Sequence, residues 1–324
     1  MKKLLRIGTR DSQLAVWQAS LVQQQLAVNG IESELIYIKS EGDIDLITPL
    51  YEMGVQGVFT KTLDAALLNN RIDIAVHSMK DLPTQLAQGL RQAAVLPRAS
   101  HKDILVYKGE GQILLDTLGY HPTNLSHEQW LTHSEPTHLL TIATSSVRRK
   151  AQWLNRYPQH RIENLRGNVN TRLQKLQESK WNGAIFAGAG LERIGLRPKE
   201  SIELDWMLPA PSQGAICIVC RETDAVSFGF ANLLNDEATA LCTKIEKDFL
   251  RVLMGGCATP ISALAVVDKE SIHFQGNILS LNGKEKISVE LSENSQNAYQ
   301  LGILAAEELL KKGGDQIIAS IRNA

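Results

Sequence analysis

The sequence predicts an α/β protein followed by a small, separate α+β domain. Short apolar runs alternate with segments of helical periodicity over about two thirds of the 324 residues. This alternation is typical of largely parallel sheets covered by helices. The last hundred or so residues instead hold a helix, three strand-like runs and a further helix. The chain is long enough for two or three domains.

The α/β part begins with a strand at 4–7 and a helix that ends near Gly30. Asp11 or Ser12 can cap the start of this helix. Its apolar face is expected to carry Leu14, Trp17, Leu21 and Val28. Further strands are expected at 35–38, 72–76, 139–143 and 184–187, and helices at 61–68, at 145–154 and around Leu191.

The C-terminal part is expected to begin with, or just before, a helix at 241–253. Three runs, at 263–267, 272–275 and 287–291, have the composition of strands in a small sheet. A last helix at 301–310 is expected to stop at Gly313 and Gly314.

Composition excludes several classes of protein. A net charge of -1 gives no bulk attraction to nucleic acid or to a membrane surface, so any cationic site must come from local clustering. The N-terminus lacks a signal-peptide core, and no apolar run approaches the roughly 18 residues that span a bilayer. We therefore expect a cytoplasmic protein with reduced cysteines.

Two cysteine patterns suggest different roles. Cys217 and Cys220 fit a CxxC motif, but they lie inside an apolar run that is typical of a buried strand, so we expect a structural role. Cys257 follows Gly255 and Gly256, which permit an unusual backbone turn. An accessible thiolate on such a turn could carry a covalent group, whereas a buried one would be inert.

Three polar loops each follow an apolar strand, where open α/β sheets place their ligands. The first, at 8–12, contains Arg10 and Ser12, and the second, at 77–83, sets Lys80 beside Asp81. The third, at 144–150, puts hydroxyls and basic residues at a helix start, against the helix dipole. A bound polyanion would offset that cost.

Arginines continue beyond the third loop, at positions 166, 172 and 193. The planar guanidinium suits bidentate binding of carboxylate or phosphate. Neither a GxxxxGK[ST] run nor a GxGxxG run is present, which disfavours nucleotides. The pattern therefore favours a ligand with many carboxylates.

Taken together, these segments closely resemble the porphobilinogen deaminase family, over nearly the whole chain and in the family's order. The matching runs are RIGTRDSQLA at 6–15, DIAVHSMKDLP at 73–83, TSSVRR at 144–149, LRGNV at 165–169 with TRL at 171–173, AGL at 189–191 with Arg193, QGA at 213–215, and GGC at 255–257 with Pro260.

The resemblance implies two α/β domains with mixed sheets, similar to periplasmic binding proteins, around a cleft, plus the small C-terminal α+β domain. It places domain 1 at 1–101 plus about 209–232, domain 2 at 102–208 and domain 3 at 237–324. The stretch 109–137 is then a surface insertion. The spacing of its histidines matches no compact ligand pattern, and no metal site is expected.

The resemblance also implies a chemistry. A dipyrromethane cofactor, made from the substrate, would be attached to Cys257 by a thioether and would prime the reaction. Four porphobilinogen units would be added with loss of ammonia, and water would release hydroxymethylbilane. The expected partner is this small molecule, without nucleic acid or membrane, and the expected state is a monomer.

Site residues follow by the same resemblance. Asp81 would stabilise the positive charge of the azafulvene formed when ammonia leaves, and would handle the proton. Lys80, Asp81, Thr144, Ser145, Ser146, Arg148, Arg149, Arg172 and Gln213 would contact the cofactor. Arg10, Ser12, Phe59, Arg166 and Arg193 would contact the substrate or growing chain.

Four residues depart from the usual family pattern: Glu41, Gln56, Thr62 and Asn182. None of them removes Cys257, Asp81 or the main arginines. A non-catalytic binding module for small polyanionic ligands is the main alternative. It would explain the two lobes and the cationic cleft, but not the third domain with its Gly-Gly-Cys turn.

Overall fold

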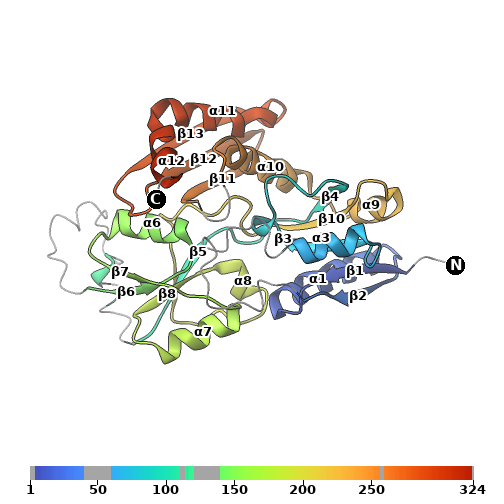
Figure 1. The fold of residues 1–324 in the computed structure, drawn as a ribbon, viewed down its shortest axis with the longest axis horizontal. Coiled ribbons are helices and arrows are strands. Elements are labelled where there is room, and N and C mark those ends of the chain that lie inside the picture. Colours follow the sequence, from blue (N-terminus) through green and yellow to red (C-terminus); the bar gives the residue numbers. More distant parts are fainter. Residues whose placement is uncertain are drawn as a thin grey trace.

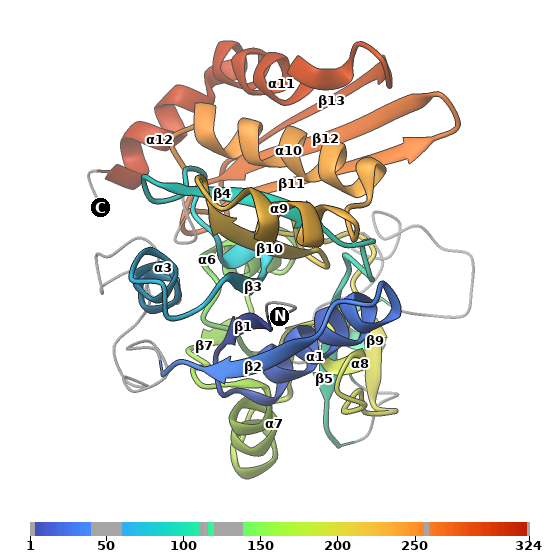
Figure 2. The same cartoon turned by 90° about the vertical axis from the view of Figure 1, so that its right-hand side faces the viewer.

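The computed structural model describes residues 4–39, 60–109, 114, 116–119, 139–255 and 259–322. The described residues form three parts, each built around one sheet. In the views of Figures 1 and 2, the C-terminal part lies above the other two. The described residues do not include Cys257, Phe59, Glu41, Gln56 or most of the expected insertion.

The first sheet has the strand order β2-β1-β3-β10-β4. Its strands are β1 (Leu5–Thr9), β2 (Ser33–Tyr37), β3 (Ile74–Ser78), β4 (Leu90–Val95) and β10 (Ile216–Arg221). β1 pairs in parallel with β2 and β3, whereas β10 runs antiparallel between β3 and β4. The sheet is therefore mixed, and its fourth strand comes from a distant part of the sequence.

Helices cover both faces of this sheet: α1 (Gln13–Val28), α3 (Lys61–Leu68) and α9 (Ala225–Asn232). Ser12 caps α1 by accepting a hydrogen bond from the Ala15 amide, as predicted. The expected apolar face is wrong in part, because Val28 is 87% exposed. The fully buried positions of α1 are Gln18, Ala19, Val22 and Leu26.

The second sheet has the order β7-β6-β8-β5-β9 and is also mixed. Its strands are β5 (Asp103–Tyr107), β6 (Thr141–Ala143), β7 (Arg161–Glu163), β8 (Gly183–Ala187) and β9 (Ser201–Glu203). Its helices are α6 (Val147–Arg156), α7 (Val169–Glu178) and α8 (Gly188–Glu192). β6, β7 and β8 are parallel, and β5 is antiparallel to β8 and β9.

The third sheet is an antiparallel meander of β11 (Ile261–Asp268), β12 (Ser271–Leu279) and β13 (Lys286–Asn294). The helices α10 (Glu237–Val252) and α11 (Leu301–Leu309) pack on it around Phe249 and Phe274. The expected stop at Gly313 is confirmed: this residue has non-helical backbone angles with a φ of 99°, and a separate helix, α12 (Asp315–Arg322), follows it.

These three sheets confirm the predicted fold class of two mixed α/β sheets and a C-terminal α+β part. The domain boundaries themselves stay predictions. Cys217 and Cys220 are confirmed as buried residues of a central strand. Burial raises the pKa of the Cys217 thiol to about 12, which suppresses thiolate chemistry there. Among the described residues, no helix has both the length and the apolar character needed to cross a membrane.

The chain crosses between the first two sheets twice, at 96–102 and again at 204–215. Glu246 of α10, which is 0% exposed, contacts both crossovers. Its carboxylate accepts hydrogen bonds from Arg98 at 2.6 Å and from the Ser212 amide, and it also accepts one from the Ala265 amide of β11 at 2.7 Å. One buried carboxylate thus joins all three sheets.

Candidate active site

A cavity of about 710 Å³ lies where the two mixed sheets meet. The loops that line it follow the carboxyl ends of β1, β3, β6 and β8. Its basic lining residues are Arg10, Lys39, Lys80, Arg148, Arg149, Arg166, Arg172 and Arg193. Among the lining residues that the structure describes, the carboxylates are Asp11 and Asp81. The cavity therefore has a strongly cationic wall.

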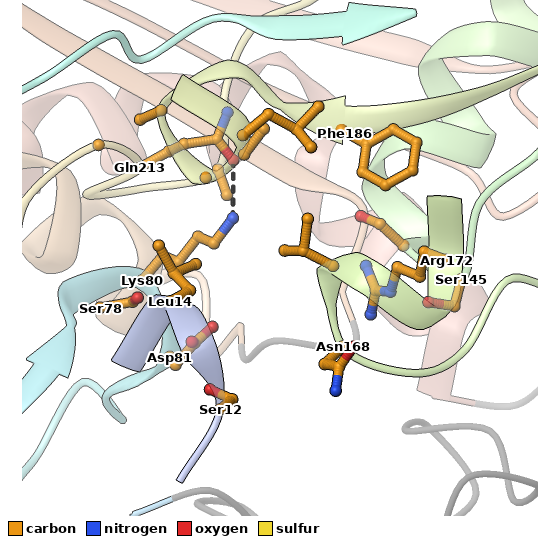
Figure 3. A pocket seen from close by; sticks show the side chains of 18 of the residues that line it. Ser12, Leu14, Ser78, Lys80, Asp81, Ser145, Asn168, Arg172, Phe186 and Gln213 are labelled. Carbon is orange, nitrogen blue, oxygen red and sulfur yellow. Dashed lines mark hydrogen bonds between the residues drawn. The ribbon is translucent and has the colours of Figure 1, made fainter. Parts of the chain in front are cut away.

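Asp81 and Lys80 lie on a 3-10 turn, η1 (Met79–Asp81), directly after β3. Figure 3 shows them on one side of the open space, with Arg172, Ser145 and Asn168 on the other. Lys80 Nζ donates a hydrogen bond of 3.1 Å to Gln213 Oε1. Asp81 lines the cavity, and within the described ranges no side chain donates a hydrogen bond to its carboxylate.

The Lys80 ammonium is affected by nearby charges of both signs. Burial lowers the pKa of Lys80 to about 8, and the nearby Arg149 and Arg148 add to this effect. Asp81 and Asp103 act in the opposite direction. Lys80 is therefore charged at neutral pH, but its charge depends on these two carboxylates.

The start of α6 has the predicted arrangement of hydroxyls and arginines. Ser146 caps the helix by accepting a hydrogen bond from the Arg149 amide at 3.4 Å. Arg148 and Arg149 are both buried and share one partner, Asp103: Nη2 of each lies 2.7 Å from one of its carboxylate oxygens. Fewer of their guanidinium N–H groups therefore remain for a ligand than the sequence alone suggests.

Arg172 and Arg193 are held by backbone carbonyls. Arg172 Nε donates to the Gly167 carbonyl at 2.7 Å, and Arg193 Nη2 donates to the Gly214 carbonyl at 2.7 Å. Burial lowers the pKa of each to about 10. An anionic ligand would favour both charged forms, since a nearby opposite charge offsets desolvation.

Most of the predicted site residues meet at this cavity. Those that line it are Arg10, Ser12, Lys80, Asp81, Ser145, Ser146, Arg148, Arg149, Arg166, Arg172, Arg193 and Gln213. Thr144 is not among them: it is buried, and its hydroxyl accepts a hydrogen bond from the Ser146 amide at 3.2 Å. Cys257 and Phe59 are outside the described residues, but Leu250, Thr259 and Ile261, on either side of Cys257, do line the cavity.

Sequence reasoning missed Asp103, the buried partner of the two arginines. Its only local signal is a carboxylate at the start of an otherwise apolar strand, DILVY. It also missed the pair Gln18 and Ser78, whose side chains are hydrogen-bonded at 2.9 Å in the cavity wall. Of the departures from the family pattern, Asn182 has a structural role, because its side chain accepts a hydrogen bond from the Thr141 amide at 2.8 Å.

The fold and the site define a class of protein: two α/β lobes around a cationic cleft, with residues of a third part in its lining. A family model described as "Porphobilinogen deaminase, dipyromethane cofactor binding domain" matches residues 5–227, and "Porphobilinogen deaminase, C-terminal domain" matches 240–311. The chain therefore belongs to the porphobilinogen deaminase family.

Full-length relatives agree with this family. The porphobilinogen deaminase of Chlorobium phaeobacteroides (strain BS1) is 38% identical over 99% of both chains. That of Syntrophotalea carbinolica is 38% identical over 98% of this chain and 96% of its own. Porphobilinogen deaminase activity in tetrapyrrole biosynthesis follows for this chain. The match over both lobes and the third part overturns the alternative of a non-catalytic binding module.

Among solved structures, the chain is similar to an ancestral cationic amino acid solute binding protein. The TM-score is 0.41 at 12% identity, over 71% of this chain and 87% of that one. The BvgS VFT2 domain of Bordetella pertussis gives a TM-score of 0.39 at 12% identity, over 71% and 85% of the two chains.

Proposed function

We propose that the cationic cavity holds the growing pyrrole chain by its carboxylates and that Asp81 serves the reacting ring. The observation that carries this proposal is the position of Asp81. It is a carboxylate with no described donor, beside Lys80 and in a wall lined by arginines. Each pyrrole unit brings an acetate and a propionate, so the wall matches the charge of the ligand.

The described residues fit the dipyrromethane cofactor of this family. A buried guanidinium is costly unless an anion compensates it, and burial lowers the pKa of Arg172 and Arg193. Carboxylates of a bound cofactor would supply that compensation. Leu250, Thr259 and Ile261 line the same cavity, so the segment that carries Cys257 begins and ends at the cleft. When bound, the cofactor supplies the carbon to which the first porphobilinogen is joined.

The chain's own residues then have separable tasks. Arg148, Arg149 and Arg172 would bind the cofactor side, together with Ser145, Ser146 and Gln213, while Arg10, Ser12, Arg166 and Arg193 would bind the incoming substrate. Amides at the start of α6 add further donors for carboxylates.

Asp81 would hold a proton and oppose the positive charge that develops on the pyrrole nitrogen when ammonia leaves. A fixed carboxylate in a partly enclosed site does this without reorganisation during the reaction. Lys80, held by Gln213, would add a cation beside Asp81 for a ligand carboxylate.

The intact mass of the purified protein tests this proposal. We expect an excess over the bare chain equal to two deaminated porphobilinogen units, on the peptide that contains Cys257. If the bare mass is found, incubation with porphobilinogen should add these two units. Cys257→Ser should acquire no stable adduct; normal cofactor and full activity in this variant would contradict the attachment.

Two finer properties are also proposed. We expect a monomer, which analytical ultracentrifugation of the loaded protein would check. We also expect a cytoplasmic location. Fractionation of cells that express the full-length protein would check this.

A further inference from the structure

Asp103, the first residue of β5, is the buried carboxylate at which the two walls of the cavity are connected. Its side chain is 0% exposed. Besides its ion pairs with Arg148 and Arg149, its Oδ1 accepts a hydrogen bond from Gln213 Nε2 at 2.9 Å. Burial by itself raises the pKa of Asp103, but the two guanidiniums and the Gln213 amide hold it well below its usual range. The carboxylate is therefore ionised throughout the neutral range.

The Gln213 amide has its orientation fixed by these contacts. Its nitrogen donates to Asp103 Oδ1 and to the His101 carbonyl at 2.8 Å. Its oxygen consequently faces Lys80 and accepts the hydrogen bond from the ammonium. If the amide were reversed, its nitrogen would face a cation, which has no acceptor to offer. The position of Lys80 thus depends on a carboxylate in the other lobe.

The charges around Lys80 lead to the same conclusion. The charged groups that act on its ammonium are Asp81, Asp103, Arg148 and Arg149. Without the charge of Asp103, two buried guanidiniums would still oppose the ammonium, and one of these two carboxylates, Asp81, would remain to favour it. Asp103 therefore sets both the geometry and the charge of the lysine beside the reacting carboxylate.

We propose that Asp103 is a positioning residue of the deaminase. It holds Arg148 and Arg149 in the wall formed by α6, and through Gln213 it keeps the charged Lys80 beside Asp81. This inference rests on the proposed function of the cavity, because the groups that it positions are those proposed to bind the pyrrole chain.

Asp103→Asn, which keeps the shape and removes the charge, tests this role. The chain offers a matched control in Asp73, another buried carboxylate between two arginines. Its side chain is 1% exposed, and its Oδ1 lies 3.0 Å from Arg6 and 3.3 Å from Arg221. Asp73 does not line the cavity. Asp73→Asn should therefore show the cost of breaking a buried ion pair without any effect on Lys80.

The first readout is the titration of Lys80, followed by NMR of the full-length protein with lysine labelled with ¹³C at Cε. The Lys80 signal is the one absent from Lys80→Arg, and intact mass ensures the same cofactor content in all samples. In Asp103→Asn the midpoint should move to lower pH by roughly one pH unit, the usual effect of one nearby opposite charge. In Asp73→Asn it should not move. Equal midpoints in wild type and Asp103→Asn would overturn the inference.

The second readout is steady-state turnover at pH 7. We expect kcat/KM of Asp103→Asn to fall at least tenfold, while Asp73→Asn stays within about twofold of wild type when both are folded. A loss of equal size in both variants would mean a purely structural role for Asp103. If Asp103→Asn does not fold, Gln213→Met decides. That variant keeps the ion pairs and breaks the link to Lys80, so an unchanged Lys80 midpoint would reject the role of Gln213 and with it the inference.

The two proposals fail in different ways. If the wild-type protein neither carries nor acquires the two-unit adduct, the proposed function is wrong, whatever the titrations show. If the adduct is present but Lys80 titrates alike in all variants, only the role of Asp103 is wrong.

Discussion

At the scale of single residues, the proposed chemistry depends on one of the two described carboxylates that line the cavity, Asp81. Asp81 lines the cavity beside Lys80, and Arg172 lies close enough for the charge of Asp81 to act on the pKa of that arginine. A carboxylate placed this way can stabilise a developing positive charge that the arginines around it cannot. The proposed division of labour is therefore binding by the cations and chemistry by Asp81.

Asp81→Ala should lower turnover of porphobilinogen by about 100-fold or more, because acid–base catalysis and charge stabilisation typically contribute at least this much. The two-unit adduct should still form, which intact mass would verify before kinetics. Asp205→Ala is a suitable control, since Asp205 is an exposed partner of Lys102 away from the cavity. Near-normal turnover in Asp81→Ala would refute the assignment.

Sequence motifs located the cavity residues that lie in polar loops, but they did not locate the buried carboxylate Asp103. Arg10, Lys80 and Asp81 could be found because each lies in a polar loop directly after an apolar strand. Asp103 could not, because its partners are 45 residues or more away along the chain and only the folded sheet brings them together. The pairing of Arg148 with Asp103, in place of a free guanidinium, was for the same reason beyond a local pattern.

At the scale of an element, the N-terminal end of α6 lines the cavity, and its C-terminal part packs in the core of the second lobe. Its first turn presents Ser146 and the two arginines, while its last turns bury Trp153. The Trp153 indole donates a hydrogen bond of 3.2 Å to His160 Nδ1, and the His160 ring stacks on Tyr157 with centroids 5.0 Å apart. This cluster fixes the helix whose start forms the cavity wall.

The protonation of His160 should couple this cluster to pH. Burial lowers the pKa of His160 to about 4, below the 6.5 of an exposed histidine. The unfolded chain therefore takes up a proton first as the pH falls from about 6.5 towards 4, and stability is lost in that window. His160→Phe should be less stable than wild type at pH 7, because the indole loses its acceptor. It should also lose about 2 kcal/mol less than wild type between pH 7 and pH 5.

Urea unfolding at these two pH values measures both effects. His273→Phe is the control, because His273 is an exposed histidine of β12 whose ring contacts Ser292 and Asp268 at the surface. An identical loss between pH 7 and pH 5 in wild type and His160→Phe would show that another group causes the pH dependence. His77, whose pKa burial also lowers to about 4, would be the next candidate.

Local sequence patterns predicted the position of several helices and strands, but they predicted less well which side chains of a helix are buried. The expected helix at 61–68 agrees with α3, and the buried strand around Cys217 agrees with β10. The buried face of α1 was predicted poorly, because Gln18 is buried by its hydrogen bonds to Ser78, a contact that hydrophobicity does not show. Gly313 was expected to end a helix and does so with a φ of 99°, whereas the following helix α12, which packs on the core through Ile317, was not expected.

At the scale of the whole molecule, Glu246 connects the third sheet to both crossovers between the lobes. Without the negative charge of Glu246, the largely buried Arg98 guanidinium would lose its ion pair with this residue. Glu246→Gln should therefore lower the free energy of unfolding by about 3 kcal/mol, the usual cost of breaking a buried ion pair. Chemical denaturation measures this, with the exposed Glu290→Gln as control. A change below 1 kcal/mol would show that the crossovers are held by other contacts.

The position of β10 has a consequence for how the protein is made. The ribosome finishes β1 to β4 first, yet β3 and β4 become neighbours of a common strand only when residues 216–221 have emerged. During the synthesis of the whole second lobe, the first therefore waits with two open strand edges, which invite pairing with other chains. Nascent chains that end between residues 100 and 215 should bind chaperones and aggregate, whereas chains a few dozen residues longer than 221 should become protease-resistant in their first lobe. A ribosome that pauses before residue 221 has been made would therefore prolong the exposure of these unpaired edges and favour aggregation.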